Sequence, residues 1–137
     1  MADLSITVAN VIAGSGAKKV AGTAGATITA GQVVYLDSAT DTYKLADCDS
    51  ATAAIRSPAG IALHGSLAGQ PLTILAKGPI TIGATVAASV AYYLSPTAGG
   101  ICPVADLSSG DYAVVLGLGT STTVIEVDIQ EAGAALA

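Results

Sequence analysis

Residues 112–129 read YAVVLGLGTSTTVIEVDI, two runs rich in β-branched residues on either side of a connection made of Gly, Ser and Thr. Val, Ile, Thr and Tyr fit the pleated surface of a sheet, so both runs are predicted to be strands. Clusters of Gly, Pro, Asp and Ser, typical of turns, separate other runs of this kind, and residues 76–79 are read as one such turn. Further strands are expected at 4–12, 33–36, 60–63, 72–75, 80–82 and 90–94.

A single short helix is predicted from Ser50 to Ile55, because Asp49 or Ser50 can cap its start and Pro58 follows its end. The fold class is therefore all-β, a small β-sandwich or barrel-like domain with one short helix and an extended N-terminal arm. A weak internal echo is also present: residues 33–36 followed by 45–47 resemble residues 91–94 followed by 104–106. Either two similar units pack face to face, or common strand composition produces the likeness.

Composition sets the class of protein. The 137 residues fit one domain, and 52% are hydrophobic although Phe and Trp are absent. No apolar run approaches the ~20 residues of a membrane-spanning helix, and the high hydrophobicity argues against disorder. The mean hydropathy of +0.66 instead indicates faces that other subunits cover.

The charge and the cysteine content indicate which kinds of partner and which cellular compartment to expect. The net charge is −5, and Lys18 and Lys19 form the one adjacent basic pair, so direct nucleic-acid binding is not expected. Cys48 and Cys102 are read as buried or half-buried thiols of a reducing compartment. The first ten residues lack the features of a secretory signal, which indicates synthesis in a cytoplasm.

The chain is divided into three parts: an arm and linker at 1–25, a β-rich domain at 26–130 and a flexible C-terminal tail at 131–137. In the arm, apolar residues alternate with small polar ones from Leu4 to Ile12, and a Gly- and Ala-rich linker follows at 13–25. Such a strand either pairs with the sheet edge of another chain or forms an edge strand of its own domain.

Signatures of catalysis are weak. His64, the single histidine, has no Gly-x-Ser-x-Gly nucleophile elbow to work with. The Asp residues near the middle of the chain do not have calcium-loop spacing, and Gly14–Lys19 fails the phosphate-loop pattern, so a flexible linker is preferred there. Glu126 and Asp128 share one strand face, which solubility explains. We expect no enzyme, no metal and no cofactor.

Several segments together resemble the capsid decoration proteins of tailed bacteriophages, also called head cement proteins. They are TAGQVVYLD at 29–37, YKLAD at 43–47, GIAL at 60–63, AGQPLT at 68–73, GPITIGA at 78–84, YYLSPTAGGI at 92–101 and LGLGTSTT at 116–123. The resemblance covers roughly residues 27–129 and depends on the order of many short pieces.

The resemblance implies a structural virion protein on the capsid exterior. Such a protein binds the major capsid protein, commonly as a homotrimer, ties neighbouring subunits together against DNA pressure, and needs neither membrane nor nucleic acid. Capsid contacts are expected at Leu4, Ile6, Val8 and Val11 of the arm. Two alternatives stay open: a low-copy head-fibre or tail-associated protein, and a surface carbohydrate-binding module that uses Tyr92, Tyr93 or Tyr112.

Overall fold

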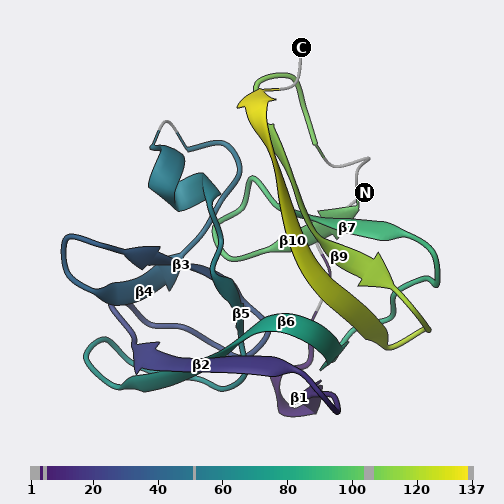
Figure 1. Ribbon diagram of the computed structural model, residues 1–137, viewed down its shortest axis with the longest axis horizontal. Helices are drawn as coiled ribbons and strands as arrows, with labels where there is room; N and C mark the ends of the chain where they lie inside the picture. The colour runs from purple at the N-terminus through teal and green to yellow at the C-terminus, as the bar shows by residue number, and fades with distance from the viewer. Residues whose placement is uncertain (1–3, 5, 51, 104–106, 136–137) are drawn as a thin grey trace.

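The computed structural model describes residues 4, 6–50, 52–103 and 107–135, with the backbone alone described beyond residue 131. Ten strands form one curled sheet in which every strand pair is antiparallel (Figure 1). The strands are β1 (Val11–Ala13), β2 (Lys18–Thr23), β3 (Val33–Asp37), β4 (Thr42–Leu45), β5 (Gly60–Ala62), β6 (Pro71–Ile82), β7 (Ala91–Leu94), β8 (Ile101–Pro103), β9 (Tyr112–Gly119) and β10 (Val124–Ala135). The predicted all-β, barrel-like fold is confirmed.

The predicted helix over Ser50–Ile55 is reduced to a single 3-10 turn, η2 (Ala53–Arg56). Thr52 before it is extended, and the Thr52 N–H donates to the Ser50 hydroxyl over 3.1 Å, which closes a local turn in place of a first helical turn. Pro58 then prevents continuation, since the residue before a proline avoids helical geometry. A second 3-10 turn, η1 (Val8–Asn10), precedes β1.

The order of strands across the sheet is β4-β3-β5-β6-β10-β9-β7-β8. Each half of the chain thus lays down a hairpin, then a strand on the other side of that hairpin, then a long strand, and the two long strands meet at the centre. The register repeats as well, because Val34 lies opposite Gly60 and Tyr92 lies opposite Gly117. The internal echo at 33–36 and 91–94 therefore corresponds to two similar units, while residues 104–106 lie outside the described ranges. The units join edge to edge through β6 and β10 in one sheet, so the expected face-to-face packing is wrong.

Strand β6 runs straight through residues 76–79, where the sequence predicted a turn; that prediction is wrong. Gly78 takes a φ of +112°, and Ala17 Cα lies 2.8 Å from the place a Cβ would occupy on Gly78. Glycine alone tolerates both conditions, so Gly78 marks a close crossing by the N-terminal chain and not a chain reversal. The register with β2 shifts nearby, between Lys77 and Leu75. Strand β6 is paired on both edges: Ile74 with β2 and β5, and Ile80 with β1 and β10.

The N-terminal segment differs from its prediction. The strand expected at Leu4–Ile12 is limited to β1, which pairs with β6 of its own chain, so of the two alternatives the structure has the edge strand of its own domain. The expected linker at 13–25 contains β2, paired with β6 from Lys18 to Thr23. This long-range pairing satisfies the backbone hydrogen bonds of a segment whose small residues gave little local strand signal.

Of the flexible C-terminal tail predicted at 131–137, residues 131–135 belong to a strand, and residues 136–137 lie outside the described ranges. Strand β10 continues through Ala135, which pairs with Tyr112 of β9. The strongly curved β9–β10 ribbon that results rises from the body in Figure 1.

Two hydrophobic clusters fill the curl of the sheet. The larger cluster lies beneath both halves and includes Ile61, Ile80, Leu94, Leu116 and Ile125. The smaller one is enclosed by β2 to β6 and includes Ile28, Val34, Tyr43, Leu72 and Ile74. Aliphatic side chains thus build the core in a chain without Phe or Trp.

Candidate interaction surface

The strand register gathers one set of side chains on the outward face of the sheet. Ile12, Thr81 and Val124 lie side by side across β1, β6 and β10. Two residues further along, Pro79, Glu126, Leu118 and Ala91 follow one another across β6, β10, β9 and β7. Residues two apart on a strand share a face, so both rows belong to one surface, which we call the β6–β10 outer face.

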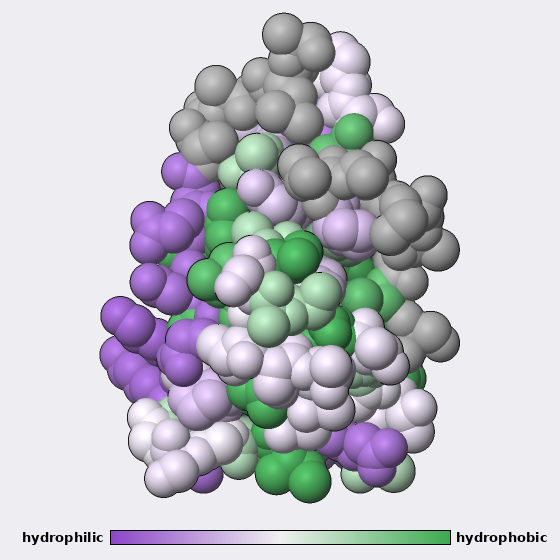
Figure 2. Space-filling model, turned by 90° about the vertical axis from the view of Figure 1, so that its right-hand side faces the viewer, coloured by the Kyte–Doolittle hydropathy of each residue, from purple (hydrophilic) through white to green (hydrophobic). Residues whose placement is uncertain are grey.

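This outer face is apolar for a surface. Ile12 is 60% exposed and Leu118 is 48% exposed, while the neighbouring Ile80 and Ile125 point inward and are fully buried. Glu126 is the single charged member of the two rows. Figure 2 shows hydrophobic atoms exposed in the middle and at the lower edge of one side of the molecule, with hydrophilic atoms gathered along its left margin.

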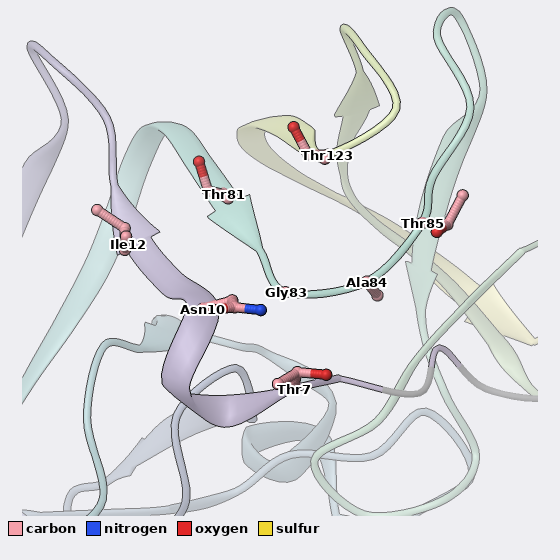
Figure 3. A pocket seen from close by; sticks show the side chains of 8 residues that line it. All are labelled: Thr7, Asn10, Ile12, Thr81, Gly83, Ala84, Thr85 and Thr123. Atoms are coloured by element: carbon pink, nitrogen blue, oxygen red, sulfur yellow. The ribbon is translucent and has the colours of Figure 1, made fainter.

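A hollow of about 510 Å³ lies at the end of this face, between the N-terminal segment and the end of β6. Its walls carry hydroxyl and amide groups but no charge: Thr7, Asn10, Ile12, Thr81, Gly83, Ala84, Thr85 and Thr123. In Figure 3 the Asn10 side chain extends across the hollow towards Gly83, and the Thr81 and Thr123 side chains point to the same side. The hollow offers hydrogen bonds beside the apolar Ile12 side chain.

The four predicted contact residues lie in different surroundings. Leu4 and Ile6 are partly buried against the larger core cluster, and the Leu4 N–H donates to the Ile101 carbonyl over 2.8 Å. Val11 is 7% exposed and belongs to that core. Val8 is 52% exposed and borders hollows of about 240 and 380 Å³. Of the four, Val8 is the side chain that a partner can reach without displacing the core.

His64 is engaged with the backbone. The Thr73 N–H donates to His64 Nε2 over 3.0 Å, and His64 Nδ1 lies 3.0 Å from the Gly65 carbonyl oxygen. These contacts tie the connection after β5 to β6. Both ring nitrogens of His64 are thus engaged by main-chain groups.

Two of the three tyrosines considered for sugar stacking are engaged in contacts within the protein. Tyr92 is buried, and its hydroxyl accepts the Ala87 N–H over 2.9 Å. The guanidinium carbon of Arg56 lies 3.5 Å from the centre of the Tyr112 ring, which covers one face of that ring. Arg56 and Tyr112 line a small hollow of about 150 Å³ with Glu131, whose carboxylate accepts the Ser57 hydroxyl over 2.7 Å.

Two titratable groups are perturbed near the loop after β4. Burial, with the charge of Asp111 as a smaller cause, raises the pKa of the Cys48 thiol to about 12. Burial also raises the pKa of Asp47, and the adjacent Asp49 carboxyl adds to this shift. Both effects disfavour the charged form, so the Cys48 thiol is protonated and unreactive at neutral pH.

Among the described residues, no group of three or more His, Cys, Asp or Glu side chains is arranged to hold a metal ion. Within the same ranges, no helix has the length and apolar character needed to cross a bilayer. No model of a known protein family matches the chain, and no curated protein matches it.

The sequence did not single out the outer face. Its members come from five strands, and none is unusual by itself. The alternation of Val124, Glu126 and Asp128 with buried residues was visible, but the neighbours of these residues depend on long-range register.

Proposed function

We propose that this chain is a structural virion protein that binds the outside of a tailed-phage head, as trimers, and joins neighbouring major capsid proteins. The resemblance of residues 27–129 to head cement proteins motivates the proposal. The β6–β10 outer face supports it, because large apolar side chains exposed on paired strands are typical of a protein interface.

The observation that carries the proposal is the outward position of Ile12 and Leu118. Both are large apolar side chains on strands that are paired to their neighbours. Because the backbone is already ordered, binding loses little backbone conformational entropy. Val8 is also exposed, but it borders the hollows beside Thr29 and Leu63 and is not part of this face. A partner that binds the assembled lattice stabilises that lattice by mass action.

The proposal is tested by measuring occupancy on heads. The double variant I12D/L118D places two carboxylates on the outer face without entering the core, and we expect it to lose at least tenfold in binding to purified heads in a co-sedimentation assay. The matched control is Leu67→Asp, since Leu67 is similarly exposed, at 58%, but lies in the connection between β5 and β6. Full occupancy of I12D/L118D would contradict the proposed docking face.

Copy number tests the function independently of that face. Quantitative mass spectrometry of purified virions is expected to give a ratio to the major capsid protein near one. A handful of copies per particle would instead favour a head-fibre or tail-associated protein. Absence of the chain from virions would overturn the proposal.

A further inference from the structure

Three of the five basic residues of the chain lie close together where β2 begins beside β6. Lys18 and Lys77 are direct cross-strand partners, and Lys19 follows Lys18. Like charges directly opposite each other on neighbouring strands are destabilising. This concentration of positive charge stands out in a chain with a net charge of −5.

The counter-charge supplied by the described residues is small. Lys77 Nζ lies 3.9 Å from Asp128 Oδ1, and both side chains are more than half exposed, so solvent screens this pair. Within the described ranges, no carboxylate comes within ion-pair distance of Lys18 or Lys19. By contrast, Lys44 elsewhere on the surface contacts Asp37 Oδ2 at 2.7 Å.

A glycine-containing turn lies beside these lysines. The Gly14 N–H donates to the Pro79 carbonyl over 2.8 Å, and the Ala17 N–H donates to the Gly14 carbonyl over 3.4 Å. The intervening N–H groups of Ser15 and Gly16 donate to no acceptor in the part of the chain that the structure describes. Gly16 has a φ of +81°, and successive free N–H groups in such a turn form a concave anion-binding nest.

The turn and the ammonium groups adjoin one another. Ala17 crosses Gly78 closely, and Gly78 is the neighbour of Lys77 in β6. The turn leads directly into Lys18 at the start of β2. Lys18 and Lys77, which are cross-strand partners, therefore lie next to a turn with two free N–H groups.

We propose that the Gly14–Lys19 turn and Lys77 bind an oxyanion, either inorganic phosphate or a side-chain carboxylate of an acidic protein. The N–H groups and the hydroxyl donate hydrogen bonds to its oxygens, and the ammonium groups supply the charge. The site holds a single oxyanion, since the negative charge of the whole chain disfavours a polyanion such as nucleic acid. This inference does not depend on the proposed function.

The experiment is a titration of the ¹⁵N-labelled full chain, followed by amide chemical shifts, with sodium phosphate or with a hexaglutamate peptide at constant ionic strength. Saturable shifts are expected at Ser15, Gly16 and Lys18. The K18Q/K77Q variant is expected to bind about tenfold more weakly, and Asp128→Asn, which frees Lys77, about twofold more tightly. Lys44→Gln is the control and should leave binding unchanged.

The two ligands separate the sources of the oxyanion. Saturation by phosphate supports a free-ion site, and saturation by the peptide alone supports a carboxylate of a partner protein. Shifts that grow linearly with both ligands, or that are the same in K18Q/K77Q, would overturn the proposal. The lysines would then serve only to protect the edge of β2 from unwanted strand pairing.

Discussion

Gly60 and Gly117 occupy equivalent positions in the two halves, and replacing either by alanine should destabilise the protein. A Cβ on Gly60 would overlap the Leu75 carbonyl oxygen of β6, and one on Gly117 would overlap the Glu126 carbonyl oxygen of β10. Both obstacles are main-chain atoms of a paired strand, so the strands must separate to admit the methyl group.

The expected cost follows from these contacts. Overpacking of this kind costs about 1–3 kcal/mol, and a weakened strand hydrogen bond adds about 1 kcal/mol. Alanine also lowers the conformational entropy of the unfolded chain, which favours the folded state by about 0.4–1 kcal/mol and offsets part of this loss. A net loss of about 2–3 kcal/mol in the free energy of unfolding is expected, or roughly 8–12 °C in Tm.

Gly65 provides the matched control. A Cβ there would meet the Ile28 carbonyl oxygen at 3.6 Å, an ordinary van der Waals distance, and Gly65 has no left-handed φ. Gly65→Ala should change the free energy of unfolding by no more than about 0.5 kcal/mol. Urea denaturation followed by far-UV circular dichroism measures all three variants, and equal stability of Gly60→Ala and Gly65→Ala would refute the reasoning.

Three further predictions concern charge, thiol chemistry and the small hollow beside β9. Because the pKa of Asp47 is raised in the folded state, its stabilising contribution is present below pH 3.8 and is lost as the pH rises through the folded pKa. Asp47→Asn should therefore be more stable than the wild type at pH 7 and not at pH 3, as urea titrations at both pH values would show. Cys48 should not react with iodoacetamide at pH 8 until urea unfolds the chain. Labelling of the folded protein as fast as that of an exposed thiol would contradict the burial of Cys48. Arg56→Ala should lower the free energy of unfolding by about 1 kcal/mol through loss of the contact with Tyr112, and an unchanged Tm would argue against that contact.

Local patterns were sufficient for the strands whose own residues carry the signal. Val and Ile alternate or cluster in β3, β9 and the first part of β10, and these strands were predicted close to their observed positions. Strand β2 was missed because its KKVAGT sequence is mostly exposed, and pairing with distant β6 decides its conformation. Gly78-Pro79 has turn composition, but both residues are paired with β10, and the positive φ of Gly78 is accommodated within the strand.

Local sequence patterns could not predict the interaction surface either, for a related reason. The position of Ile12 beside Thr81, and of Leu118 beside Glu126, depends on which strands pair and in which register. The predicted contacts at Leu4 and Ile6 assumed an exposed arm, whereas both side chains pack partly against the core. Whether they also meet a capsid stays a prediction.

The mirrored strand order gives the molecule the internal arrangement of two joined subunits. Strand β6 of one half meets its counterpart, β10, through four antiparallel residue pairs, as the same strand from two separate chains can do. Residues 83–90 connect the halves, so their association is intramolecular and does not weaken on dilution. The β6–β10 pairing therefore forms at any protein concentration. Two separate half-length chains would form the same pairing only at high concentration.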